Sequence, residues 1–412
     1  MSTTVRLRHL AQINPGTPAF NNLKGDDELT FLPMEAVWPD NRLDISQRRT
    51  KKEVSTGYTR FQDGDILVPK ITPTFEAGRS VLIKGLLGGL GTGTTELHVV
   101  RPGKEIDPKF LLYVANTHNF LKLGEAQMYG VAGQQRVPDS FLRDLPVRLP
   151  SLEEQRRIVS FLDTEIARID SLSRLRTTQI RMLAERLDAE RDSLFGGSSG
   201  DTATPLMHLT DPYRPIVYGI VQAGPEHPDG VPYIKTGDLK NLHPRSLSRT
   251  SPEIHRQFRR AAVHPGDLVM AMRASIGAVA IVPPELPEAN LTQGTARIAA
   301  AKNVCTEWLY NALQTRRVQE QCDLRAVGST FRTLNIWDLR RVVLWVPHDR
   351  KQTEIVAQFR IVESQNSGLA NYAQHQIALL SERRQALITS AINGQFDVTT
   401  ASGRNVTEGV AV

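Results

Sequence analysis

The sequence is poor in cysteine and has no long apolar run. Its 412 residues include two cysteines, Cys305 and Cys322, which form no Cys-x-x-Cys pair. A disulfide framework and a structural zinc site are therefore not expected, and a reducing cytoplasm fits the composition. No stretch of about 18 apolar residues occurs, and the N-terminus lacks the apolar core of a signal peptide. We expect no membrane span and a cytoplasmic protein.

Motifs that bind nucleotides or catalytic metals are also missing. The glycine-rich segment 85–93 lacks the Lys-Ser/Thr pair of a P-loop, and turns between strands explain it better. The segment Asp211-Pro-Tyr213 resembles the acidic-Pro-Pro-aromatic motif of amino-methyltransferases but lacks its second proline. The ten histidines form no HExxH pair. We predict no catalytic residues, no metal site and no cofactor for this chain.

The net charge is +6 and the isoelectric point is near 9.3. Lysine and arginine side chains neutralise phosphates, so this balance is compatible with a nucleic-acid partner. Many basic proteins bind nothing acidic, and the charge alone does not decide the matter.

The most informative feature is an internal repeat. The pattern Pro150…Gln155…Ile158 returns as Pro347…Gln352…Ile355, with an offset of 197 residues. Further upstream, Gly64-Asp65 matches Gly266-Asp267 with a slightly larger offset. Small shifts of this kind are expected when loops diverge on a shared scaffold. The chain is therefore predicted to run globule, helix, globule, helix.

Each copy ends in a segment with the a/d pattern of a coiled coil, in which apolar residues alternate in steps of three and four. These positions are Leu162, Ile166, Ile169, Ile180, Leu183, Leu187 and Leu194 in the first copy, and Phe359, Ala370, Ala373, Ile377, Leu380, Leu387 and Ala391 in the second. So narrow a stripe requires a partner helix. The duplication favours an antiparallel coiled coil between the copies over two helices that pack only on their own globules.

The predicted fold class is α+β, with two globular domains separated by a pair of long antiparallel coiled-coil helices. Short β-rich runs predict strands, and two segments before the long helices, 107–121 and 306–322, look helical. The predicted boundaries are 1–150 for the first globular domain, 151–197 for the first helix, 198–347 for the second globular domain, 348–396 for the second helix and 397–412 for a polar, disordered tail.

In this order and duplicated, these segments resemble the specificity subunits of Type I restriction-modification systems over nearly the whole chain. Residues 149–158 are similar to the family's proline-to-EQxxI start of a spacer helix, and residues 380–395 to its C-terminal helix end. The first helix lacks that fuller ending. Segments 70–78 and 93–102 resemble one class of target recognition domain, and segments 273–277, 290–294 and 328–332 resemble another.

The resemblance implies a non-catalytic subunit in which each globular domain is a target recognition domain that reads half of a bipartite sequence in double-stranded DNA. The helices would set the gap between the half-sites and dock two modification subunits, which would bring S-adenosylmethionine and methyl transfer. Restriction subunits would add cleavage and translocation. The predicted subunit-interface residues are the seam positions Leu162, Ile166, Ile169, Ile180, Leu183, Leu187, Phe359, Ile377, Leu380 and Leu387.

Candidate DNA contacts are polar side chains in or next to the segments that resemble recognition domains, and in the polar loop at 134–136, because arginine can bind guanine and glutamine adenine in the major groove. They are Lys70, Arg79, Gln134, Gln135 and Arg136 in the first copy, and Arg273, Gln293, Ser329, Thr330 and Arg332 in the second. Each could equally be a solvated or phosphate-facing residue. The basic clusters 48–52 and 256–260 are candidates for phosphate contact only.

Two other functions remain open at this point. One is an autonomous DNA-binding repressor, which would bind DNA tightly without partners. The other is a fused methyltransferase or nuclease, against which the missing motifs argue. A methylation assay on the isolated chain distinguishes an enzyme from a recognition subunit.

Overall fold

A computed structural model describes residues 3–131, 135–220, 222–329, 332–395 and 398. The chain forms two compact units: unit 1 comprises Met1–Arg176 and His375–Val412, and unit 2 comprises Thr177–Gln374. Each unit thus contains one globular domain and segments of both long helices, α4 (Leu152–Phe195) and α9 (Asp349–Asn393). Except for Val398, the predicted tail lies outside the described residues.

Unit 1 contains two four-stranded sheets, with orders β2-β11-β8-β9 and β6-β3-β10-β7. Strands β3 and β10 are parallel and the other pairs are antiparallel. The strands are β2 (Ala11–Ile13), β3 (Glu28–Leu32), β6 (Arg48–Thr50), β7 (Thr59–Gln62), β8 (Ile66–Pro69), β9 (Val81–Leu82), β10 (Leu90–Gly93) and β11 (Leu97–Pro102), with a hairpin of β4 (Val37–Trp38) and β5 (Arg42–Leu43). Strand β1 (Thr3–Arg6) pairs with β12 (Pro146–Leu149), which leads into α4.

Unit 2 repeats this plan. Its sheets have the orders β14-β20-β17-β18 and β16-β15-β19, and β15 is parallel to β19 as β3 is to β10. Strand β13 (Thr202–Pro205) pairs with β21 (Val343–Val346), which leads into α9. The other strands are β14 (Val217–Tyr218), β15 (Val231–Ile234), β16 (Arg249–Thr250), β17 (Leu268–Ala271), β18 (Val279–Ile281), β19 (Asn290–Leu291) and β20 (Thr295–Ile298), with α5 (Pro252–Phe258) after β16. The duplication seen in the sequence is thus a duplication of topology.

Segments 107–121 and 306–322 are helical, as predicted, and each is divided between two helices. In unit 1 these are α1 (Pro108–Val114) and α2 (His118–Ala126), and in unit 2 α6 (Thr306–Leu313) and α7 (Arg316–Arg325). The hydroxyl of buried Thr117 accepts a hydrogen bond from the Phe120 N–H at 3.2 Å and caps α2. Threonine in this role begins a new helix, a local effect that the apolar periodicity does not reveal.

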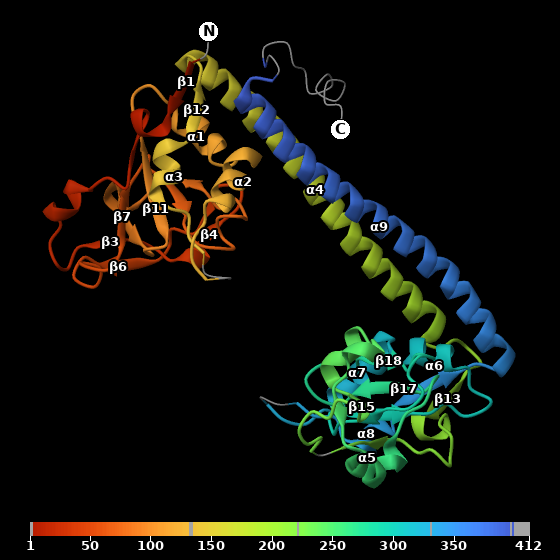
Figure 1. The fold of residues 1–412 in the computed structure, drawn as a ribbon. Helices are drawn as coiled ribbons and strands as arrows, with labels where there is room; N and C mark the ends of the chain where they lie inside the picture. The colour runs from red at the N-terminus through yellow and green to blue at the C-terminus, as the bar shows by residue number, and fades with distance from the viewer. Residues whose placement is uncertain (1–2, 132–134, 221, 330–331, 396–397, 399–412) are drawn as a thin grey trace. The chain divides into compact units, whose positions relative to one another are not determined.

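The two central strands explain the uninterrupted apolar runs of the sequence. Along β8, Ile66 and Val68 face the cluster formed with the helices, whereas Leu67 faces the cluster between the two sheets. Strand β17 alternates in the same way. Because side chains alternate across a strand, a strand covered on both faces is apolar at every position. Figure 1 shows α1, α2 and α3 (Asp139–Asp144) gathered on one side of unit 1.

In each unit, a segment of α4 runs antiparallel to a segment of α9. In unit 1, Leu162, Ile166 and Ile169 share one buried cluster with four residues of α9, namely Leu387, Ile388, Ala391 and Ile392. In unit 2, the rings of Phe195 and Phe359 meet edge to face with their centroids 5.2 Å apart. The predicted antiparallel coiled coil is confirmed. Within the described part of the chain, no helix has the length and apolar character needed to cross a membrane.

The seam residues point into the chain itself. Leu162 and Phe359 are 0% and 1% exposed, Ile166, Ile169 and Leu387 are buried, and Leu187 and Leu380 pack against the two cores. Ile180, Leu183 and Ile377 are half-buried. The buried members therefore hold the fold together, and their side chains are not available to a separate subunit. A docking surface has to come from other faces of the helices.

The repeated glutamines attach each long helix to its globule. Gln155 is 0% exposed, and its side chain accepts a hydrogen bond from the Asp107 N–H at 2.7 Å. It donates to the carbonyls of Glu105 and Pro150 at 3.0 and 2.9 Å. Gln352 repeats this arrangement in unit 2, accepting from the Cys305 N–H and donating to the Pro347 carbonyl. The motif at the start of each helix is thus a structural joint.

A second joint has opposite charges in the two units. In unit 1, Lys109 of α1 pairs with Asp163 of α4 at 2.5 Å. In unit 2, Glu307 of α6 pairs with Arg360 of α9. These residues occupy equivalent positions in the repeat, so the ion pair is kept while its polarity is reversed.

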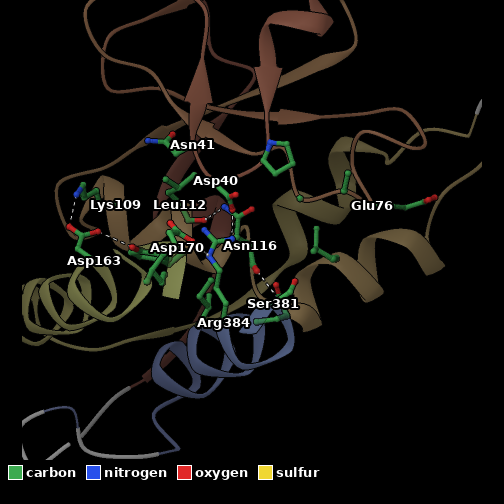
Figure 2. Close-up of a pocket in the computed structure, with 18 residues that line it drawn as sticks. Asp40, Asn41, Glu76, Lys109, Leu112, Asn116, Asp163, Asp170, Ser381 and Arg384 are labelled. Atoms are coloured by element: carbon green, nitrogen blue, oxygen red, sulfur yellow. Dashed lines mark hydrogen bonds and ion pairs between the residues drawn. The ribbon is translucent and has the colours of Figure 1, made fainter. Parts of the chain in front are cut away.

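Unit 1 also encloses a cavity of about 490 Å³ between its globule and the two helices (Figure 2). Arg384 of α9 enters it and pairs with Asp40, at the tip of the β4–β5 hairpin, and with Asp170 of α4 at 3.8 Å. Gln385 donates to the Asn116 carbonyl at 2.9 Å beside it. The position equivalent to Arg384 in the first copy is Leu187, so this polar joint belongs to unit 1.

Candidate nucleic-acid interface

In unit 1, the end of strand β8 meets segments 129–131 and 135–137, which pair with each other through Tyr129 and Arg136 and are called the hairpin of unit 1 below. Arg136 bridges to both Ile71 and Tyr129, and the Val137 N–H donates to the Lys70 carbonyl at 2.8 Å. The Thr72 N–H donates to the Gln135 carbonyl at 3.1 Å. These contacts bring three predicted residues together, namely Lys70, Gln135 and Arg136. Gln134 lies outside the described residues.

An ion pair braces this hairpin. Arg136 forms two hydrogen bonds with Glu96, of 2.9 and 2.8 Å. The guanidinium lowers the pKa of Glu96 below its usual value, and the carboxylate raises the pKa of Arg136. A paired arginine is held in one orientation, so this ion pair fixes Arg136 against the residue that precedes β11.

Lys70 and His98 lie at the base of the hairpin. The Lys70 ammonium donates to the Thr95 carbonyl at 2.7 Å, and burial lowers the pKa of Lys70. The buried His98 ring has Nε2 2.9 Å from the Val137 carbonyl and Nδ1 3.1 Å from the Asn14 amide. Since a carbonyl only accepts, Nε2 carries the proton. Burial also lowers the pKa of His98, so the ring is neutral and fixes the strand under the hairpin.

Unit 2 forms the same site from different residues. Thr333 bridges to both Arg273 and Val327, so segments 327–329 and 332–333 form the hairpin of unit 2 at the end of β17. The Met272 N–H donates to the Gly294 carbonyl at 2.8 Å, which places Gln293 beside Arg273. The predicted residues Arg273, Gln293, Ser329 and Arg332 are thus brought together, and all but the half-buried Gln293 are exposed. Thr330 lies outside the described residues.

The second hairpin is also braced by an arginine. Arg332 pairs with Asp323 of α7 at 3.3 Å and donates to the Asp323 carbonyl. Arg136 pairs with Glu96, next to a strand, whereas Arg332 pairs with Asp323 on a helix. In both units an ion pair holds the end of the hairpin against the globular domain. The architecture is common to both units, while the side chains it presents differ.

Arg79 is not brought to this site. Its guanidinium donates to the Val37 carbonyl at 3.3 Å, and its Nε is buried without a hydrogen-bond partner among the described residues. Arg79 therefore supports the β4–β5 hairpin. Nothing in its geometry favours the predicted contact with DNA.

Sequence reasoning missed the apolar residues of the two hairpins. Tyr129 and Val131 in unit 1 and Val327 in unit 2 are 62%, 80% and 65% exposed. Exposed apolar side chains beside polar ones suit contact with a thymine methyl or a base edge. The repeat could have revealed them, because Tyr129 and Val327 occupy nearly equivalent positions in the two copies.

The family model "Type I restriction modification DNA specificity domain" matches residues 53–181 and 223–377. The chain belongs to this family. Each matched region contains the hairpin of its own unit and part of one long helix. The predicted resemblance is confirmed.

Curated relatives and solved structures agree with this assignment. The chain is 36% identical over 209 residues to the Type I restriction enzyme EcoAI specificity subunit of Escherichia coli, which covers 50% of this chain and 32% of that protein. It is 39% identical over 180 residues to the EcoEI specificity subunit of the same organism, with 43% and 30% covered. The matched region thus spans about a third of the length of these relatives.

The fold is shared over nearly the whole chain with two solved structures. One is described as "Structural basis underlying complex assembly and conformational transition of the type I R-M system", with a TM-score of 0.74, 20% identity, and coverage of 96% of this chain and 98% of that chain. The other is the HsdS subunit from Thermoanaerobacter tengcongensis, with a TM-score of 0.54, 19% identity, and 96% and 97% covered.

Proposed function

We propose that this chain is the non-catalytic DNA-recognition subunit of a Type I restriction-modification complex. Each unit reads one half of a bipartite target in double-stranded DNA through its hairpin at the end of β8 or β17. The observation that carries the proposal is one site built twice with different polar groups, Lys70, Gln135 and Arg136 against Arg273, Gln293 and Arg332. Different side chains on the same scaffold read different bases, so the two half-sequences differ.

The chemistry belongs to partner subunits in this proposal. Two modification subunits bring S-adenosylmethionine and transfer the methyl group, and restriction subunits cut and translocate DNA. The complex works in the cytoplasm. Nothing in the geometry favours the alternative of an autonomous repressor, and binding of a bipartite target only by the assembled complex distinguishes the two.

A surface for two copies of one partner supports this division. Six apolar side chains on the long helices are between 47% and 63% exposed: Leu172, Leu175, Met182, Leu369, Tyr372 and Leu379. The second three repeat the first at the offset of 197 residues. Each unit carries three of them, on the flank of the helices beside the buried seam. Exposed apolar patches mark protein contacts, and equivalent patches suit identical partners.

Motif mapping tests the recognition role. The chain is co-expressed with its modification subunit, and methylated bases are mapped in the host genome. We expect a discontinuous, non-palindromic motif. Arg136→Ala should relax only one half of it and Arg332→Ala only the other. A continuous motif, or a change in both halves from either variant, would refute the proposal.

Co-purification tests the docking surface. Leu175→Asp and Tyr372→Asp place a charge in the two patches without touching the buried seam, and together they should abolish binding of the modification subunits. Ser55→Asp adds the same charge at an exposed position of the first globular domain, away from both helices, and serves as the matched control. Normal assembly of the double variant would show that the partners dock elsewhere.

A further inference from the structure

Unit 2 carries an exposed tryptophan flanked by two cations. Trp337 lies on the short helix α8 (Ile336–Leu339) and is 61% exposed. The guanidinium groups of Arg340 and Arg341 lie 5.5 and 4.9 Å from the centre of its indole ring. Among the described residues, neither arginine forms an ion pair with a carboxylate. The nearest acid in sequence, Asp338, accepts from the Asn335 amide at 3.5 Å.

The group is held rigidly beside the hairpin of the candidate interface. Thr333 closes that hairpin and precedes Trp337 by four residues, so their Cα atoms are at most about 14 Å apart. Leu334 is buried, and its N–H donates to the Met272 carbonyl at 2.9 Å. Leu339 is fully buried at the other end of α8. Both ends of the helix are thus anchored, while the ring and the cations point out of the core.

Unit 1 has no counterpart to this group. The position equivalent to Trp337 is Ser140 of α3, and the flanking residues include Asp139 and Asp144. There Arg143 pairs with Asp139 at 3.2 Å, and Asp144 pairs with Arg6 at 3.2 Å. The same helix is therefore neutralised in unit 1 and cationic in unit 2. The fold does not require Trp337, because its side chain is mostly exposed and unit 1 has a serine at the equivalent position.

We propose that Trp337, Arg340 and Arg341 grip the phosphodiester backbone of DNA flanking the half-site read by unit 2. The arginines donate to phosphate oxygens, and the indole ring packs against the adjoining deoxyribose. Guanidinium groups match phosphates in charge and in hydrogen-bond geometry, and such contacts position a protein without reading bases. This proposal rests on the proposed DNA-recognition function and adds an anchor beyond the half-site on one side only.

The test uses the complete complex with modification subunits and fluorescence anisotropy on two duplexes. One duplex ends at the half-site of unit 2, and the other extends about ten base pairs beyond it. For Arg340→Ala/Arg341→Ala, we expect roughly tenfold weaker binding to the long duplex at moderate salt. The slope of log affinity against log salt should fall by about 2, since each phosphate contact contributes about 0.9. On the short duplex, variant and unaltered complexes should bind alike.

Controls separate the possible outcomes. Trp337→Ala should weaken binding to the long duplex with a smaller change in slope, and Arg143→Ala in unit 1 should leave the slope unchanged. If the Arg340→Ala/Arg341→Ala complex binds the long duplex with the same affinity and the same salt dependence as the unaltered complex, the inference is wrong. A changed methylation motif in this variant would also overturn it, because it would show that the residues read bases. Loss of co-purification with the modification subunits would overturn it too, because it would show that the residues contact a protein. If the unaltered complex shows no preference for a bipartite sequence, the proposed function itself fails.

Discussion

Replacing Gln155 with leucine tests the joint between the first long helix and its globule. Leucine has a similar volume but can neither accept from the Asp107 N–H nor donate to the carbonyls of Glu105 and Pro150. Leaving a buried backbone group without a partner costs about 1–3 kcal/mol. Because groups near the surface can recruit water, we expect a total loss of about 3 kcal/mol in the free energy of unfolding of unit 1.

Urea unfolding measures this loss, and hydrogen exchange followed by mass spectrometry assigns it to a unit. The amides at the start of α4 and α1 should exchange faster in Gln155→Leu, while the peptides of unit 2 keep their protection. Gln352→Leu is the matched variant. It removes two hydrogen bonds instead of three, so it should lower the free energy of unfolding by about 2 kcal/mol and loosen unit 2. A loss below about 0.5 kcal/mol for Gln155→Leu, the level of an ordinary surface change, would refute the reasoning.

Two further predictions concern titration and reactivity. Burial lowers the pKa of His98, so the unfolded chain takes up a proton near pH 6.5 before the folded chain does; stability is full above that pH and is lost as the pH falls. Urea unfolding of unit 1 between pH 8 and 5 should show this decline, and His98→Gln should reduce it; an unchanged slope in the variant would contradict the assignment. Burial raises the pKa of Cys322 to about 12, so iodoacetamide at pH 8 should modify the half-buried Cys305 first and Cys322 only on unfolding. Rapid labelling of Cys322 in the folded protein would count against its buried position.

Some of the candidate site was accessible from residue types and spacing. Lys70, Gln135 and Arg136 lie together in unit 1, and Arg273, Gln293, Ser329 and Arg332 lie together in unit 2. These residues are at most 66 positions apart within each copy, and they lie in or near segments that resemble recognition domains or in a polar loop. Arg79 directly follows one of those segments, yet it supports a different hairpin. The direction of an arginine side chain depends on which carbonyl or carboxylate lies within hydrogen-bonding distance. That partner, such as the Val37 carbonyl for Arg79, comes from a strand far away in the sequence.

The sequence by itself determined the duplication, the long helices and their antiparallel pairing. These features are periodic: a seam repeats every three or four residues, and Gln155 and Gln352 recur at one offset, so a local pattern is enough to find them. Only the tertiary structure decided how they are used. It showed that the seam is internal, that the ion pair of Lys109 and Asp163 is reversed in Glu307 and Arg360, and that each hairpin is braced from a different element. Such contacts join residues far apart in the chain. They depend on strand register and turn geometry, which no short segment of sequence specifies.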